Sequence, residues 1–227
     1  MPIVNHTTRI ITCKLVYYGP GGSGKSSNLT HLYGSLPAHE TGELTSFANR
    51  RERSLKFEYM PAGLGSVGPY QVQFEICTAP GQSNYQASRE SLINGADGIA
   101  FIADSRIDSL DGNLSCLRDL HATLVAQGVS SQSLPFVFQY NKQNLPADEI
   151  ATVQELSAAL NVRNLPAFAA NAVSGEGVIE TLQSLATQLL RHLGAASGAT
   201  APVAEIDFDN LDFEMEHVET PHTRAAA

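Results

Sequence analysis

Apolar residues recur along the chain in two alternating patterns, short continuous runs and longer stretches with three- and four-residue spacing. The short runs are rich in β-branched and aromatic residues and predict strands at 10–18, 55–60, 70–78, 98–104, 134–140 and 166–170. The spaced stretches predict helices at 27–36, 108–127, 152–160 and 178–193, and a capping box of Thr152 and Glu155 opens the third. We therefore expect an α/β fold, with a mixed, mostly parallel sheet and helices on both faces.

The periodic pattern stops after Gly194. Residues 195–202 are mostly small, as in a flexible linker, and residues 205–216 alternate acidic with apolar side chains. We expect one domain at 1–194 and a disordered acidic tail at 195–227. Two interpretations of the tail stay open: a solvated segment without a specific role, or a docking segment for a partner that uses Ile206, Phe208, Leu211, Phe213 and Met215.

A glycine-rich motif with the pattern G-x-x-x-x-G-K-[ST] lies between the first predicted strand and the first predicted helix. The backbone N–H groups of such a loop turn toward phosphate oxygens, and the following helix adds its positive end. Lys25 is expected to reach the β- and γ-phosphates, and Ser26 to bind Mg²⁺. The motif predicts a nucleoside triphosphate site formed by Gly19, Gly21, Gly22, Ser23, Gly24, Lys25, Ser26 and Ser27.

Composition narrows the classes of partner. The net charge of −9 argues against nucleic acid, because a phosphate backbone would be repelled. The three cysteines are widely spaced and are expected to be reduced core residues. We find no run of about 18 apolar residues and expect no direct membrane insertion. The sequence predicts a cytoplasmic protein, with recruitment to a cell pole through partners as an open alternative.

Two further features of the sequence match residues that take part in phosphoryl transfer. The strand 70–78 is followed by Gly81 and Gln82, which match a γ-phosphate contact and a residue that orients the attacking water in Ras-like proteins. A structural turn at Pro80 and Gly81 is the alternative.

The charged run 50–53 contains Arg53, which is suited to stabilise charge in phosphoryl transfer, and Ser54 could supply a hydroxyl to Mg²⁺. A solvated charged face is the alternative there.

A second motif, Asn141-Lys142-Gln143-Asn144, follows the strand 134–140, where guanine-binding proteins carry N-K-x-D. Asn144 cannot accept both guanine hydrogen bonds as an Asp does, because its amide nitrogen only donates. It suits a xanthine nucleotide, or it leaves a weaker guanine site. An ordinary loop is the alternative. Ala170, Asn171 and Ala172 follow the last strand and are expected to approach the base.

The chain resembles the bacterial MglA family of Ras-like P-loop GTPases, which are switches of gliding motility and cell polarity. The resemblance covers about residues 5 to 193 and rests on Cys13-Lys14-Leu15-Val16-Tyr17-Tyr18-Gly19-Pro20-Gly21, Arg53-Ser54-Leu55-Lys56-Phe57, Pro80-Gly81-Gln82, Tyr85-Gln86-Ala87-Ser88-Arg89, Ala103-Asp104-Ser105 and Gln139-Tyr140-Asn141-Lys142. It implies a GTP/GDP cycle with Mg²⁺ and slow hydrolysis, with Arg53 as an intrinsic arginine finger and Gln82 positioning the water. It also implies a Roadblock-fold activating partner of the MglB type and polarity or motility effectors.

Asn144 and the acidic tail depart from the pattern of this family. Two functions therefore stay open. The first is a GTP-hydrolysing switch whose loops at 37–54 and 80–94 become ordered when the triphosphate binds. The second is a pseudo-GTPase scaffold, with or without bound nucleotide, that acts through its tail.

Overall fold

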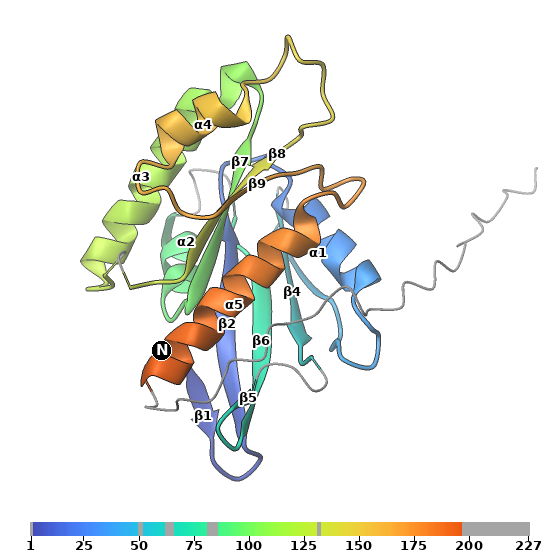
Figure 1. The fold of residues 1–227 in the computed structure, drawn as a ribbon, viewed down its shortest axis with the longest axis vertical. Coiled ribbons are helices and arrows are strands. Elements are labelled where there is room, and N and C mark those ends of the chain that lie inside the picture. The colour runs from blue at the N-terminus through green and yellow to red at the C-terminus, as the bar shows by residue number, and fades with distance from the viewer. Residues whose placement is uncertain (1, 50–51, 62–65, 81–85, 131–132, 197–227) are drawn as a thin grey trace, which may run out of the picture.

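The computed structural model describes residues 2–49, 52–61, 66–80, 86–130 and 133–196 (Figure 1). The described strands are β1 (Ile3–Asn5), β2 (Ile10–Tyr18), β3 (Thr45–Asn49), β4 (Glu52–Tyr59), β5 (Ser66–Val67), β6 (Tyr70–Thr78), β7 (Gly98–Asp104), β8 (Phe136–Asn141) and β9 (Ala167–Ala169). The helices are α1 (Lys25–Ser35), α2 (Gln86–Ile93), α3 (Leu110–Ala126), α4 (Val153–Leu160) and α5 (Val178–Ala196), with a 3₁₀ turn η2 (Ile107–Ser109) before α3.

These strands form one sheet in the order β3-β4-β6-β2-β7-β8-β9, with β1 paired to β2 and β5 paired to β6. The strands β6, β2, β7, β8 and β9 are parallel to their neighbours in this run, whereas β3 and β4 are antiparallel. Because the parallel strands share a direction, their carboxyl ends meet at one end of the sheet. Ligands bind at that end in open α/β folds.

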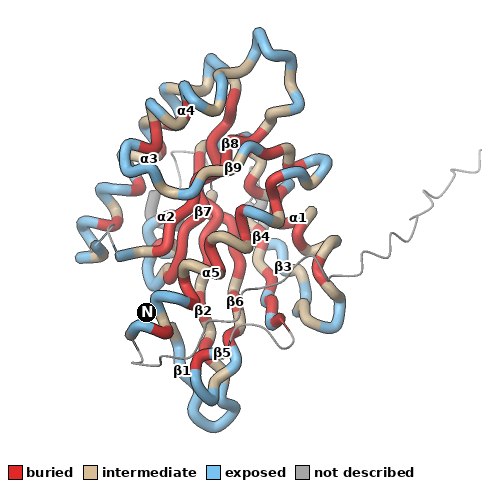
Figure 2. Tube along the Cα trace, viewed as in Figure 1, coloured by how far each residue is buried: buried red, intermediate tan, exposed pale blue. Residues whose placement is uncertain are grey.

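Helices cover both faces of the sheet, and buried residues follow its central strands (Figure 2). On one face, Cys13, Leu15 and Tyr17 of β2 join a core with residues of α1 and α5. On the other face, Val16 and Tyr18 join a core with residues of α2, α3 and α4. Successive side chains of a strand point to opposite faces, so the last four residues of β2, Leu15 to Tyr18, form a continuous apolar run because both faces are covered there.

The predicted α/β architecture is confirmed. The limits of β2, β6 and β7 match the predicted strands 10–18, 70–78 and 98–104, while β4 begins three residues earlier than predicted and β8 two residues later. The capping box at the start of α4 is present: the Thr152 hydroxyl accepts from the Glu155 N–H at 3.2 Å, and the Glu155 carboxylate accepts from the Thr152 N–H at 2.8 Å. The cysteines are free and buried.

Two segments that were predicted as loops contain regular structure. The segment 37–54 includes β3 and the start of β4, and the segment 80–94 includes α2. Both elements are polar: β3 reads Thr-Ser-Phe-Ala-Asn, and the large apolar residues of α2 stand at its last two positions. Pairing of β3 with β4 therefore supplies order that the hydrophobic pattern does not encode.

α5 ends at Ala196, two residues past the predicted boundary at Gly194, and the predicted tail lies outside the described residues from 197 onward. Within the described part of the chain, none of the helices is both long enough and apolar enough to span a membrane.

One buried hydroxyl gives a test of this core. Tyr17 is fully buried, and among the described residues its hydroxyl has no hydrogen-bond partner. We expect Tyr17→Phe to raise the free energy of unfolding by about 1 kcal/mol, because it removes a buried polar atom and keeps the ring. Urea denaturation measures this change. Tyr140→Phe is the matched control and should lower stability, since the Tyr140 hydroxyl accepts from Ser157 at 3.0 Å. A Tyr17→Phe protein no more stable than its parent would contradict the expectation.

Candidate functional site

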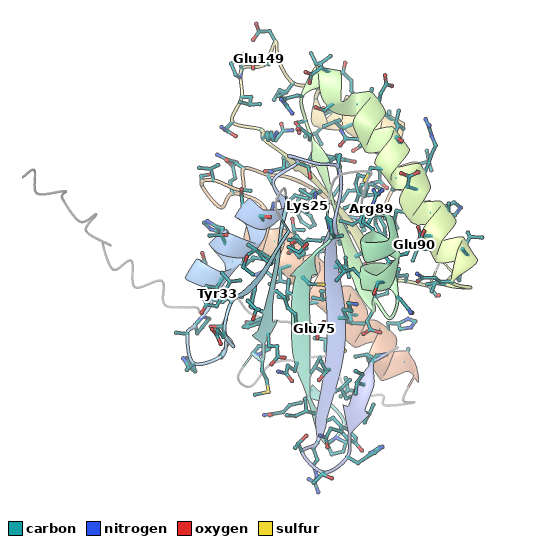
Figure 3. The ribbon with its side chains drawn as sticks, turned by 180° about the vertical axis from the view of Figure 1, so that it is seen from behind. Lys25, Tyr33, Glu75, Arg89, Glu90 and Glu149 are labelled. Atoms are coloured by element: carbon teal, nitrogen blue, oxygen red, sulfur yellow. The ribbon has the colours of Figure 1, made fainter. Side chains whose placement is uncertain are left out.

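The glycine-rich loop lies between the carboxyl end of β2 and the start of α1, where Figure 3 labels Lys25. The Lys25 ammonium donates to the carbonyls of Gly19 at 2.9 Å and Pro20 at 2.7 Å, and the side chain is buried. These bonds curve the loop around the lysine. The backbone N–H groups that begin α1 lie directly after this curve, so the loop and the positive helix end are adjacent, as phosphate binding requires.

Two glycines of the loop have no tolerance for a side chain. Gly24 has φ +98° and is the N-cap of α1, and a Cβ there would collide with the amide nitrogen of Asn141. Gly19 has φ +152°, and a Cβ there would collide with the backbone carbonyl of Ile102. The first position therefore needs glycine both for its left-handed backbone and for space, and the second needs it for space.

Asn141, the last residue of β8, connects the loop to the far side of the site. Its amide nitrogen donates to the Ser23 carbonyl at 2.7 Å, and its amide oxygen accepts from the Ala172 N–H at 2.9 Å. Asn141 is 2% exposed, so both bonds are shielded from water. The structure thus brings together three of the predicted segments, the glycine-rich loop, the Asn141 motif and residues 170–172.

The residues after Asn141 form a second cluster with β7. Lys142 has φ +73°, and its ammonium donates to the carboxylate of Asp104 at 2.7 Å. The Arg106 guanidinium bonds the same carboxylate, at 2.8 Å for its closest nitrogen. Burial alone would raise the pKa of Asp104, but the bonds from Arg106 and Lys142 outweigh it and hold that pKa below its usual value. The carboxylate therefore stays ionised and fixes the Lys142 side chain.

The sequence did not predict Arg106 or Asp104 as site residues. The one local signal for Asp104 is its place at the carboxyl end of a fully buried strand, next to the end of β8. Arg106 has no such signal, because it lies two residues after the end of β7 and its contact with the Asp104 carboxylate cannot be seen in the sequence.

The two segments that are expected to lie near the base, residues 143–144 and 170–172, differ in how exposed they are. Gln143 donates its N–H to the Ala170 carbonyl at 3.0 Å, which holds the Asn141 motif against residues 170–172. Asn144, next along the chain, is exposed. Ala170 and Ala172 are buried, and the Asn171 carboxamide accepts from the Val173 N–H at 3.1 Å. The Ala172 N–H already donates to the carboxamide oxygen of Asn141.

On the opposite side, Thr78 holds β4 to β6. The Thr78 hydroxyl accepts from the Leu55 N–H at 2.8 Å, and Thr78 is buried. Ser54 precedes Leu55 on β4 and is half-buried, and Arg53 pairs through its backbone with Ala48 of β3. Gly81 and Gln82 lie outside the described residues, as does the Arg53 side chain. The roles of these four residues stay predictions.

The described residues of the glycine-rich loop fit a phosphate group, and they fit a cation whose ligands include oxygens of that phosphate. The Ser23 hydroxyl is fully buried and has no hydrogen-bond partner among the described residues. It can therefore form a hydrogen bond with a group that binds in the loop. In the described part of the chain, no group of three or more acidic, histidine or cysteine side chains could hold a metal. A Mg²⁺ ion at this end of the sheet would therefore need phosphate oxygens in addition to hydroxyls such as that of Ser26.

No protein-family model matches the chain. It is 40% identical over 193 residues to the mutual gliding-motility protein MglA of Myxococcus xanthus, a match that spans 85% of this chain and 98% of that protein. Its fold is similar to that of the Arl6 (BBS3) small GTPase from Trypanosoma brucei, solved with the nucleotide analogue GppNp. That match has a TM-score of 0.55 at 20% identity and covers 80% of this chain and 99% of the other.

At 20% identity the likeness to Arl6 shows the fold alone: a Ras-like P-loop NTPase. The likeness to MglA goes further, because identity at this level extends over nearly all of that protein. The glycine-rich loop at the carboxyl end of the sheet agrees with both comparisons. The chain therefore belongs to the MglA family of Ras-like small GTPases.

Proposed function

We propose that the protein is a switch that binds GTP or GDP with Mg²⁺, hydrolyses GTP slowly and controls cell polarity or motility through the partners it binds. The observation that supports this most is the pair of hydrogen bonds made by Asn141. A nucleotide has a phosphate end and a base end, and Asn141 fixes the loop suited to the first relative to the segment suited to the second. We propose guanine as the base because the chain belongs to a family of small GTPases.

In this proposal each part of the chain has one task in hydrolysis. Lys25 and the N–H groups of its loop bind the phosphates, and Gln82 orients the attacking water. Arg53 stabilises the charge that develops on the transferred phosphoryl group. Mg²⁺, held through Ser26 and Ser54, supplies further positive charge at the β- and γ-phosphates when it is bound. Segments 37–54 and 80–94 then differ in structure between the GTP and GDP states.

The position of Arg53 depends on how β4 pairs with β6. Leu55 donates to Thr78 at the carboxyl end of β6, and Arg53 lies two residues before Leu55 on the same strand. A partner that binds β3 and β4 can therefore move Arg53 by changing this pairing. We place a Roadblock-fold activator of the MglB type in that role, and we propose separately that partners recruit the protein to a cell pole.

Loss of the Asn141 bonds should weaken nucleotide binding. We expect Asn141→Ala to reduce GDP affinity by tenfold to a hundredfold, since an unpaired buried polar group costs about 1 to 3 kcal/mol. Dissociation of a fluorescent GDP analogue measures the effect, with circular dichroism to show that the variant is folded. Gln143→Ala, which loses a 2.7 Å bond to the Ser105 hydroxyl, is the control and should change affinity by less than about threefold. Unchanged affinity in folded Asn141→Ala would contradict the proposal.

Base selectivity depends on Asn144. We expect the wild type to bind GDP, and Asn144→Asp to bind it about tenfold or more tightly, because a carboxylate accepts both hydrogen bonds of guanine. Competition of GDP, XDP and ADP for the same labelled nucleotide checks this. Equal affinity of the two proteins for GDP would mean that the base is read elsewhere, and preference of the wild type for XDP would count against guanine.

Hydrolysis separates the switch from a scaffold. In single-turnover reactions with GTP and Mg²⁺, we expect Gln82→Leu to slow hydrolysis by about tenfold or more while GTP affinity is kept, because only water positioning is lost. Arg53→Ala should act in the same direction, and Arg9→Ala, on the turn between β1 and β2, is the matched control that should have no effect. If wild type and Gln82→Leu hydrolyse GTP at the same rate, the protein is a scaffold rather than a switch.

A further inference from the structure

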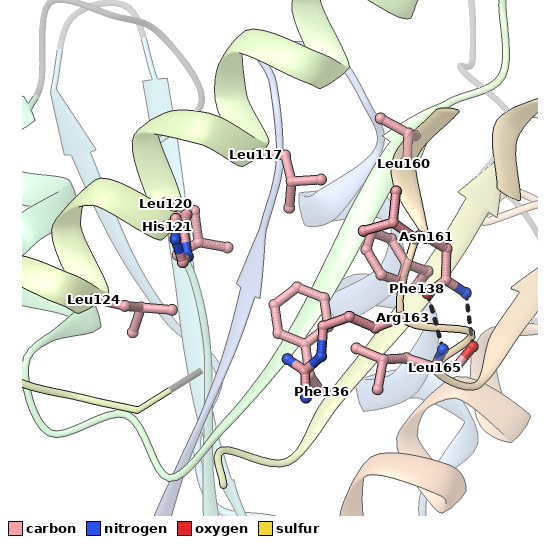
Figure 4. Close-up of a pocket in the computed structure, with 11 residues that line it drawn as sticks. Leu117, Leu120, His121, Leu124, Phe136, Phe138, Leu160, Asn161, Arg163 and Leu165 are labelled. Atoms are coloured by element: carbon pink, nitrogen blue, oxygen red, sulfur yellow. Dashed lines mark hydrogen bonds between the residues drawn. The ribbon is translucent and has the colours of Figure 1, made fainter. Parts of the chain in front are cut away.

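A second concave site lies away from the strand ends. It is a cavity of about 280 Å³ between α3, β8 and the loop after α4 (Figure 4). We call it the α3–β8 groove, defined by Leu117, Leu120, Leu124, Phe136, Phe138 and Leu165. Phe136 begins β8 and Asn141 ends it, so Phe136 in the groove and Asn141 at the nucleotide site are about 17 Å apart along one strand.

The mouth of the groove carries polar and positive groups. Arg163 and His121 line it and are exposed, and Val162, which is 82% exposed, lies beside them. The loop that carries Arg163 is fixed by two bonds between the Asn161 carboxamide and the Leu165 backbone, at 2.7 and 2.8 Å. The groove therefore combines a fixed apolar floor with a cation at its mouth.

We propose that the acidic tail of the same chain docks in this groove through residues 205–216. This segment alternates large apolar residues with carboxylates, and it has no Lys or Arg. In an extended conformation Leu211, Phe213 and Met215 project to one side and the intervening acids to the other. The apolar side matches the floor of the groove, and the acidic side matches Arg163 at its mouth.

The tail is long enough to reach the groove. Phe136 donates its N–H to the Gln188 carboxamide of α5 at 3.3 Å, so Gln188 lies next to the start of β8. From Gln188 to the end of α5 at Ala196 the helix rises about 12 Å. Residues 197–205 span up to about 30 Å when extended, which leaves about 18 Å for the passage from the start of β8 around the sheet after the return of about 12 Å along α5.

Because the tail is covalently joined to the domain, even weak contacts with the groove are enough to keep it docked. A short flexible linker gives the tail an effective concentration on the order of 1 mM at the groove. With an intrinsic dissociation constant of about 0.1 mM, roughly nine tails in ten are then docked. This inference goes beyond the switch function and does not depend on it, because the groove contains no residue of the nucleotide site.

The chain has no tryptophan, so one substitution introduces a unique reporter. In the full-length protein, Phe213→Trp should give blue-shifted emission and weak quenching by acrylamide, because the indole is buried in the groove. Phe208→Trp, in a second protein, tests whether the other aromatic residue is the one that inserts. Adding Arg163→Glu should raise the quenching constant of the inserted reporter about fivefold, as expected if a tenfold loss of affinity lowers docking from nine tenths to one half.

The matched control is Arg118→Glu, the same charge reversal at an exposed residue of α3 that does not line the groove. It should leave emission and quenching unchanged. Water-like emission from both reporters, or equal quenching with and without Arg163→Glu, would overturn the proposal. Blue-shifted emission that fades on dilution would overturn it too, because the groove would then be occupied by the tail of a second copy.

Discussion

The geometry of the nucleotide site depends on one buried carboxamide. Asn141 holds the Ser23 carbonyl with one end and the Ala172 N–H with the other, and Gly24 has to be glycine because the amide nitrogen of Asn141 occupies the space of a side chain. Neither bond can be replaced by water, since Asn141 is almost fully buried. Three loops that are far apart in the chain therefore keep one arrangement.

A second buried polar contact makes this side of the site rigid. Gln139 of β8 donates to the Asn28 carboxamide of α1 at 2.8 Å, and Asn28 donates to the Gly24 carbonyl at 3.0 Å. On the opposite side, β4 is joined to β6 by backbone pairing up to Lys56 and Cys77, and the Thr78 hydroxyl then accepts from the Leu55 N–H. One half of the site is thus fixed by buried amides, while the half that carries the proposed switch residues is held by pairing between strands and by the Thr78 hydroxyl.

β8 also joins the two sites of the molecule. Its carboxyl end supplies Asn141, and its amino end supplies Phe136 to the α3–β8 groove. A tail bound in that groove would leave the loop around Lys25 and the strands β3 and β4 accessible to nucleotide and activator. The acidic segment, which the typical family pattern lacks, would thereby add a contact to the fold without competing with its family function.

The sequence by itself determined the features whose cause is local. The glycine-rich loop is contiguous, β7 is buried along its whole length, and β2 and β6 alternate apolar with polar residues before they end in buried runs, so spacing and hydrophobicity were enough to predict them. The same signals failed for β3 and α2, which are polar and obtain their order from neighbours. Only the tertiary structure decided which groups the site residues meet. The Ser23 carbonyl is 118 residues from Asn141, and Asp104 is 38 residues from Lys142, so the sheet has to form before either pair can exist.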